Sequence, residues 1–274
     1  MIVHLIDGTY ELFRHFYGLK RAKSASVGRF GAVAGVLNSV LQMIADGATH
    51  IGVATDHVIE SFRNELWDGY KTGEGIEHEL RVQFWPLEEA LRAMGVAVWA
   101  TIEIEADDAL ASAAELASHD PRVEQICIWT PDKDLSQCVR GDRIVQIDRR
   151  SSAVRNAAGV REKFGVDPQC IPDYLALVGD SADGYPGVRG IGAKGAASLI
   201  SRHGRIEDFP PEVLGDHHAQ ALLFKKLATL RTDAQLFETV DELRWRGPTD
   251  DFANISEQLG LSKAYARAHD LTPR

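Results

Sequence analysis

The chain is poor in cysteine and has no long apolar run. It contains three cysteines, Cys127, Cys138 and Cys170, in 274 residues. Because an odd number of widely spaced cysteines fits neither a disulfide framework nor a zinc knuckle, we expect free thiols in the reducing cytoplasm. The most apolar segment, residues 30–45, contains polar side chains and falls short of the roughly 20 residues that span a bilayer, so we expect a core helix there. The start of the chain, MIVHLID, lacks the pattern of a secretory signal.

The chain is also short of positive charge. Its 30 Lys and Arg residues are outnumbered by 40 Asp and Glu residues, which gives a net charge of −10. Taken alone, this balance argues against a polyanionic partner such as DNA. A set of the acids is nevertheless placed where bound divalent cations would reverse the local field. The set consists of Asp7, Asp56, Glu105, Asp107, Asp108, Asp132, Asp134, Asp180 and Asp183.

Short apolar runs alternate with helical patterns in the first two-thirds of the chain. The strand-like runs are IVHLI, HIGVAT, VAVWA, EQICIWT and DRIVQI, and the helical patterns cover residues 9–19, 30–46, 85–94 and 106–117. This alternation predicts an α/β fold with a mainly parallel sheet flanked by helices on both faces. After Asp148 the strand signals stop, and short helices are expected at residues 160–164, 171–178, 193–201 and 217–230. We therefore expect a catalytic α/β domain over residues 1–157 and a helical lobe over residues 158–274.

Several of the nine acids follow predicted strands. Ligands of parallel sheets bind beyond the carboxyl ends of the strands, which is where Asp7, Asp56, Asp132 and Asp134 stand. Each acidic group has an ordinary explanation, as a helix start, a Pro-Asp turn or a loop. The hypothesis of a metal site depends on the whole set, which offers oxygen donors without a matching cysteine or histidine cluster. Such ligands favour Mg²⁺ or Mn²⁺ over zinc.

A glycine-rich stretch, GVRGIGAKGAASLI, occupies residues 187–200. Glycines let the backbone approach a ligand closely, and a helix beginning near Ala193 would point free N–H groups at a phosphate. Alone, the stretch fits a dinucleotide-binding loop or a tight turn equally well. No strand precedes it, which disfavours the dinucleotide reading.

These elements, in this order, resemble the 5′-nuclease family, which includes the amino-terminal domain of bacterial family A DNA polymerases, phage 5′-exonucleases and flap endonucleases. The resemblance rests on LIDGTYELFR, EADDALAS, TPDKDLSQ and GDSADGYPGVRGIGAKGAASLI, and on Tyr70-Lys71. It implies a PIN-like α/β domain with a helical arch at about residues 70–84. It further implies a helix-three-turn-helix DNA clamp at about residues 179–202.

The resemblance also assigns roles to residues. It makes the nine acids the ligands of two Mg²⁺ ions, which Mn²⁺ can replace. Lys71 looks like the arch lysine that reaches the scissile phosphate, Tyr70 like its stacking neighbour and Arg14 like a phosphate-steering arginine. The DNA backbone would be held by Gly190, Ile191, Gly192, Ala193, Lys194 and Gly195, and a K⁺ ion by main-chain carbonyls of Leu177, Val178, Pro186, Val188 and Ile191.

The chain departs from the family pattern in the arch. Glu74 stands where the family usually has an arginine, and Glu77 and Glu79 follow it, which weakens the electrostatic attraction of DNA. The apolar run before Asp56 also ends in Ala-Thr instead of a bulky residue.

The function expected from the resemblance is hydrolysis of DNA phosphodiesters at 5′ ends and 5′ flaps during replication or repair. The partner would be DNA with a free 5′ end, a flap or a junction, and the protein a cytoplasmic monomer. Two alternatives are a catalytically inactive DNA-junction binding protein and a PIN-type ribonuclease, which would lack the glycine-rich clamp. We see no polymerase part within these 274 residues.

Overall fold

The sheet has six strands in the order β3-β2-β1-β4-β5-β6. The computed structural model describes residues 1–22 and 28–272. The strands are β1 (Ile2–Asp7), β2 (His50–Asp56), β3 (Ala97–Thr101), β4 (Gln125–Trp129), β5 (Ile144–Asp148) and β6 (Ala153–Arg155). The first five are parallel to one another, and β6 runs antiparallel to β5. The expected α/β fold with a mainly parallel sheet is confirmed.

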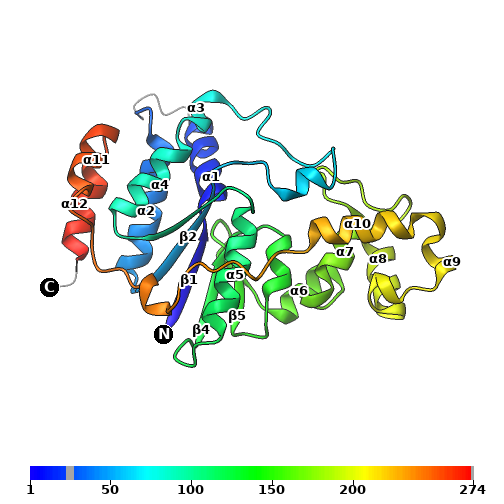
Figure 1. The fold of residues 1–274 in the computed structure, drawn as a ribbon. Helices are drawn as coiled ribbons and strands as arrows, with labels where there is room; N and C mark the ends of the chain where they lie inside the picture. The colour runs from blue at the N-terminus through cyan, green and yellow to red at the C-terminus, as the bar shows by residue number, and fades with distance from the viewer. Residues whose placement is uncertain (23–27, 273–274) are drawn as a thin grey trace.

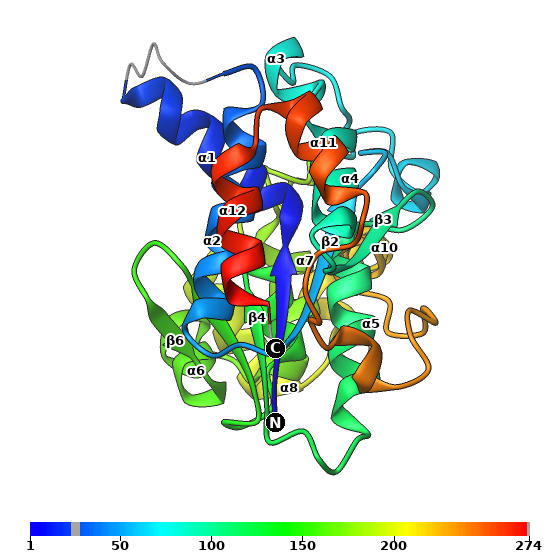
Figure 2. The same cartoon turned by 90° about the vertical axis from the view of Figure 1, so that its left-hand side faces the viewer.

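Helices cover both faces of the sheet (Figures 1 and 2). One face packs against α1 (Gly8–Arg21), α2 (Gly31–Ala45) and α4 (Phe84–Ala93), and the opposite face packs against α5 (Ala106–Ser118). These helices bury Val36, Leu41 and Leu91 on the first face and Leu110 on the second. Burial of such side chains stabilises each layer by roughly 1.5–3 kcal/mol per large residue.

A second core lies in the helical lobe, which the chain forms after the sheet (Figure 1). The lobe contains α6 (Ala157–Phe164), α7 (Ile171–Val178), α8 (Ala193–His203), α9 (Pro211–Leu214) and α10 (His218–Ala228). Its core includes Leu175, Leu177 and Phe224, which are buried between α7 and α10. The lobe therefore has an apolar centre separate from the two faces of the sheet.

The last two helices lie against the sheet domain and not in the lobe. They are α11 (Phe252–Leu259) and α12 (Ser262–Leu271), which pack on α4 and α2. Phe252, Leu261 and Ala268 join the core that those helices form with the sheet. The sequence expectation that all residues from 158 onward belong to the lobe therefore differs from the structure here. An amphipathic helix shows in its sequence that it has an apolar face, but not which core that face joins.

The strand β6 was not expected, because the sequence gives no strand signal after Asp148. It is a three-residue edge strand whose Ala153 and Val154 are exposed, so no alternating apolar pattern marks it. Ser152, in the turn before β6, has a φ of 56°.

A connecting segment, residues 57–83, joins β2 to α4 and includes the predicted arch. Figure 1 shows it crossing from the sheet to the lobe and back. It is mostly irregular, with the short helices η1 (Phe62–Glu65) and α3 (His78–Arg81). Trp67 Nε1 donates to the Gly184 carbonyl at 3.1 Å, and Lys71 N donates to the Asp183 carbonyl at 3.0 Å. The segment is thereby anchored on the lobe.

Candidate metal centre

The neighbouring strands β1 and β2 end in carboxylates at the same edge of the sheet. Asp7 is the last residue of β1 and caps α1, where its Oδ1 accepts a hydrogen bond from Tyr10 N at 2.8 Å. Its Oδ2 accepts from the Thr130 hydroxyl at 3.0 Å. Asp56 ends the neighbouring β2, and its Oδ1 accepts from Ala106 N at 2.8 Å. The parallel register of β1 and β2 thus brings two acids to the start of α5.

The N-cap and the first turn of α5 supply three more acids, Glu105, Asp107 and Asp108. Glu105 caps the helix and is 4% exposed. Its carboxylate accepts hydrogen bonds from the Ser61 hydroxyl at 2.7 Å and the Tyr70 hydroxyl at 3.3 Å. Asp107 lies close enough to Asp132 and Asp7 that their negative charges act on it. Acids that are far apart in the sequence therefore share one region.

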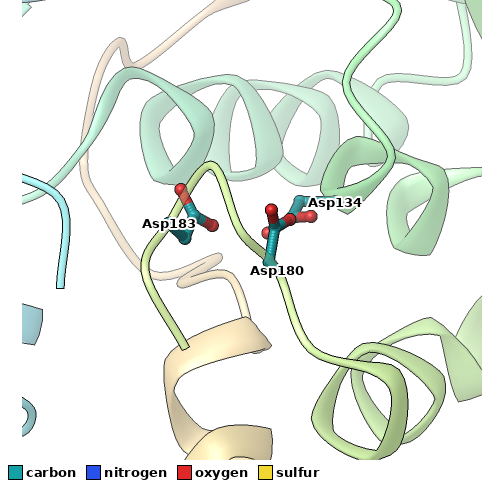
Figure 3. Close-up of side chains that lie close together, drawn as sticks. All are labelled: Asp134, Asp180 and Asp183. Atoms are coloured by element: carbon teal, nitrogen blue, oxygen red, sulfur yellow. The ribbon is translucent and has the colours of Figure 1, made fainter. Parts of the chain in front are cut away.

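A second group joins the sheet domain to the lobe (Figure 3). Asp134 begins the short helix η2 (Asp134–Cys138), and Asp180 and Asp183 belong to the loop that follows α7. One oxygen from each of these three carboxylates lies within 4.8 Å of the others. The Oδ1 atom of Asp134 is buried and has no hydrogen-bond partner among the described residues. An orphaned buried carboxylate oxygen is costly unless a cation completes its surroundings.

The electrostatics of the site favour bound cations. Burial, together with the charges of Asp56 and Asp132, raises the pKa of Asp7 to about 7. Burial and neighbouring carboxylates hold the pKa of Asp107 and of Asp134 well above the usual range. Carboxylates repel one another in this way when no cation lies among them. An all-oxygen donor set of this kind fits a hard divalent ion such as Mg²⁺.

Lys71 lies between the two groups. Its Nζ is 2.7 Å from Glu105 Oε2 and 2.9 Å from Asp183 Oδ1, so it joins an acid of α5 to an acid of the lobe. Burial disfavours its charge, but Glu105 and Asp183 together hold its pKa well above the usual value. Tyr70 is buried beside it, with Lys71 Nζ 5.7 Å from the centre of the Tyr70 ring. Both arch residues singled out from the sequence therefore lie at the carboxylates.

Asp108 differs from the other acids because Arg63 contacts both of its carboxylate oxygens, whereas it contacts only one oxygen of Glu105. The Arg63 guanidinium contacts both Asp108 oxygens, at 2.7 and 2.8 Å, and the two side chains are 1% and 0% exposed. The same oxygens accept from the main-chain N–H groups of Glu105 and Arg231. These contacts use the directions that a metal ion would need, so the structure gives Asp108 the position of a buried counter-ion.

Arg14 also has other partners than the resemblance implies. Its guanidinium pairs with Glu11 at 2.6 Å and contacts His15 and Ser39, between α1 and α2. Among the described residues, none of the nine acids is an ion-pair partner of Arg14.

The predicted DNA clamp lies on the surface of the lobe. Gly192 precedes α8, and Ala193, Lys194 and Gly195 are exposed in its first turn. Gly190 has a φ of 86° with open space around it. The first N–H groups of α8 therefore face solvent and are free to meet a phosphate.

The carbonyls predicted to hold K⁺ belong to the last two residues of α7 and to the loop before α8, which lie in close contact. A Cβ atom on Gly187 would lie 2.7 Å from the Leu177 carbonyl oxygen, and Val188 N donates to that same oxygen at 2.9 Å. Only glycine at 179 and 187 permits this approach, because both positions have positive φ.

Three residues that organise the site, Arg63, Thr130 and Lys133, were not singled out from the sequence. Arg63 holds Glu105 and Asp108, and Thr130 holds Asp7. Lys133 in the same way pairs with Asp180 at 2.7 Å. Nothing in the sequence FRNEL indicates that its arginine, Arg63, is buried. Thr130 could have been predicted, because it directly follows a predicted strand, where polar side chains that bind ligands are expected.

Comparison with known proteins covers nearly the whole chain. Residues 2–165 match the family model described as 5′-3′ exonuclease, N-terminal resolvase-like domain, and residues 166–251 match 5′-3′ exonuclease, C-terminal SAM fold. The 5′-3′ exonuclease of Buchnera aphidicola is 30% identical over 92% of this chain and 89% of its own length. DNA polymerase I of Pseudomonas aeruginosa is 33% identical over 87% of the chain, which spans only 28% of that polymerase.

Solved structures share the fold. A zinc-bound bacteriophage T5 5′-exonuclease superposes with a TM-score of 0.70 at 19% identity, covering 99% of this chain and 98% of that one. The catalytic core of Rad2 in complex with a DNA substrate superposes with a TM-score of 0.64 at 14% identity, covering 99% and 92%. The chain belongs to the 5′-3′ exonuclease family.

Proposed function

We propose that the chain is a structure-specific nuclease that hydrolyses DNA phosphodiesters at 5′ ends and 5′ flaps with two bound Mg²⁺ ions. The observation that carries this proposal is the convergence of buried carboxylates from the strand ends, from α5 and from the lobe around Lys71. Family membership supports nuclease activity. Replication or repair, as in the removal of flaps and primers, is the role that this activity would serve.

Two sets of residues would hold the ions. Asp7, Asp56, Glu105 and Asp107 surround the ends of β1 and β2, and Asp132, Asp134, Asp180 and Asp183 surround the junction with the lobe. Asp108 is left out of both sets because Arg63 contacts both of its oxygens and two main-chain N–H groups donate to them as well. Bound divalent ions in such a site activate a water and neutralise charge on the phosphate.

The chain's own side chains orient these ligands and bind the DNA. Ser61 and Arg63 fix the Glu105 carboxylate, and Thr130 fixes Asp7. The Lys71 ammonium group, already next to the acids, would add positive charge beside the scissile phosphate. The Tyr70 ring lies beside the Lys71 ammonium group. The placement of Arg14 between α1 and α2 gives no support for a direct phosphate contact, so we assign it none.

The lobe would hold the duplex. Gly190, Ile191, Gly192, Ala193, Lys194 and Gly195 would contact DNA phosphates, and K⁺ bound by the carbonyls of Leu177, Val178, Pro186, Val188 and Ile191 would support that loop. Contacts to the backbone position DNA without reading its sequence, so we expect selection by shape. Glu74 and Glu79 are exposed on the connecting segment, so we expect this selection to come with modest affinity.

We propose a cytoplasmic location and a monomeric state. The cysteines among the described residues are free thiols, which fits a reducing compartment.

The decisive experiment is cleavage of a 5′-labelled flap duplex in Mg²⁺ and in EDTA. We expect cutting in Mg²⁺ and none in EDTA, with a 5′-phosphate on the product. Asp134→Asn keeps the shape of the side chain but removes its charge, and should lower the rate by at least about 100-fold, since even outer-shell partners of metals contribute about 10–100-fold. Asp250→Asn, an exposed acid far from the site, serves as the matched control.

Other outcomes would point to the alternatives. Binding of the flap duplex without any cutting would indicate an inactive junction-binding protein. Cutting of RNA but not DNA would indicate a PIN-type ribonuclease. Cutting that persists in EDTA would refute the metal site.

A further inference from the structure

A cavity of about 570 Å³ lies at the base of the connecting segment, beside the carboxylates. Its walls come from residues 57–60, which directly follow Asp56, from residues 76–82, which lead back to the sheet domain, and from the first turn of α4. The volume is within the roughly 300–1,000 Å³ typical of ligand sites. Nothing in the proposed cleavage or in the clamp of the lobe uses this cavity.

An exposed aromatic pair lines the cavity. The ring of Trp85 stacks on His57 with a centroid distance of 5.1 Å and an interplanar angle of 7°, yet Trp85 remains 61% exposed. The buried Glu88 accepts hydrogen bonds from the Thr55 hydroxyl at 2.9 Å and contacts His57 Nδ1 at 2.8 Å. The imidazole is therefore fixed, and it holds the indole in place. A large apolar ring that is positioned but left uncovered is a feature of binding sites.

The edge of the same cavity carries one arginine, Arg81, and two acids, Glu60 and Glu89. Arg81 is exposed, lines the cavity and forms no ion pair among the residues that the structure describes. Its acidic neighbour Glu60 accepts a hydrogen bond from Gly73 N at 3.0 Å. A flat apolar surface with an exposed guanidinium beside it matches a nucleotide, which pairs a flat base with a negative phosphate.

We propose that this cavity binds an unpaired base of the 5′ strand, stacked on Trp85, with the adjoining phosphate beside Arg81. The inference rests on the proposed function, since that function brings a single-stranded 5′ end to Asp56. His57 follows Asp56 directly in the chain, so the cavity lies next to a proposed metal ligand. The base held here would therefore belong to a nucleotide close to the one that is cut. Stacking accepts every base, so the site strengthens binding of unpaired DNA without adding sequence preference.

The test measures DNA binding in EDTA, so that cleavage does not interfere. A flap duplex carries 2-aminopurine at successive flap positions, and stacking on Trp85 should quench its fluorescence at one or two of them. Trp85→Ala should abolish the quenching and raise the Kd for the flap duplex at least about fivefold, because stacking of one base on an aromatic ring contributes this much or more. The Kd for a blunt duplex of the same sequence should not change.

Three further variants make the result specific. Trp85→Phe keeps an aromatic face and should retain most of the affinity and quenching. Arg81→Ala should weaken flap binding and reduce its salt dependence. Val154→Ala removes an equally exposed apolar side chain from β6 and should leave both duplexes unaffected.

Two results would overturn the proposal. One is an absence of quenching at every flap position with the unaltered protein. The other is a loss of affinity in Trp85→Ala that is equal for flap and blunt duplexes. These outcomes are distinct from failure of the nuclease proposal: quenching that depends on Trp85 in a chain that cuts no DNA would support the base site and refute the nuclease, whereas cutting with unchanged flap affinity in Trp85→Ala would do the reverse.

Discussion

Lys71 contacts acids from both halves of the molecule, which makes it the side chain best placed to add charge at a bound phosphate. We expect Lys71→Ala to lower the single-turnover cleavage rate about 100-fold, as the loss of one preorganised electrostatic contact does elsewhere. Lys226→Ala, an exposed lysine of α10, is the control. If additional Mg²⁺ restores the full rate to Lys71→Ala, the lysine only substitutes for metal and the assignment is wrong.

Arg63 and Asp108 form a buried pair whose role differs from that of the metal ligands. Arg63→Met leaves Asp108 charged and unpaired in the interior, so we expect the free energy of unfolding to fall by about 3–5 kcal/mol. Urea denaturation followed by circular dichroism measures this change.

Asp108 and Asp134 are expected to have different roles, the first in stabilising the fold and the second in binding metal. Asp108→Asn should destabilise the fold while leaving the Mg²⁺ concentration for half-maximal cleavage unchanged, and Asp134→Asn should raise that concentration. A large increase for Asp108→Asn would show that Asp108 binds metal despite its contacts with Arg63.

The acids at the site could be found from the sequence because they follow apolar runs that read as strands. Asp7 and Asp56 stand at positions fixed by the parallel register, so knowing the strands was enough to place them. The partners of these acids depend on distant parts of the chain. Arg63 also donates to the Leu227 and Thr229 carbonyls, which are more than 160 residues away. Arg14 pairs with Glu11 within α1, at an i,i+3 spacing that the sequence itself offers, whereas its contact with Ser39 depends on how α1 sits on α2.

At the scale of elements, periodicity predicted the five parallel strands and the helices between them. It did not predict the packing of α11 and α12. Apolar residues such as Phe252 and Leu261 indicate that a helix has a buried face, but they do not indicate which core that face packs against. It also gave no sign of β6, whose side chains are largely exposed. What remained unpredictable was therefore decided by tertiary contacts and not by local preference.

The first turn of α8 is the element proposed to hold the duplex. Lys194 is exposed there, and its loss should weaken binding to all DNA sequences alike. We expect Lys194→Ala to reduce the slope of log Kd against log salt by about 0.9, the value for one lost phosphate contact. Fluorescence anisotropy with a blunt duplex measures the slope, and Lys263→Ala on α12 is the control. A slope that is unchanged in Lys194→Ala would remove this lysine from the interface.

At the scale of the whole molecule, the carboxylates lie where the sheet domain meets the helical lobe. Asp134 extends from the sheet domain, whereas Asp180 and Asp183 extend from the lobe, and their mutual repulsion opposes the contact between the domains. Lys71 and Lys133 offset part of this repulsion. Bound cations would supply the rest, so metal binding and the stability of the assembled protein should be coupled.

We therefore expect Mg²⁺ to stabilise the protein more at pH 8 than at pH 5. Asp7 has a pKa raised from 3.8 to about 7 in the folded protein, so without metal the native state binds more protons than the unfolded chain between these values. The free energy of unfolding then falls as the pH rises through this window. Mg²⁺ needs the deprotonated carboxylates, and at about 100 times its Kd each site should add about 2.7 kcal/mol at pH 8. Thermal unfolding in Mg²⁺ and in EDTA at both pH values measures the difference. Asp183→Asn should lose part of the rise in Tm, and Asp250→Asn should keep all of it. An equal rise at pH 5 and pH 8 would mean that the ion binds somewhere other than these carboxylates.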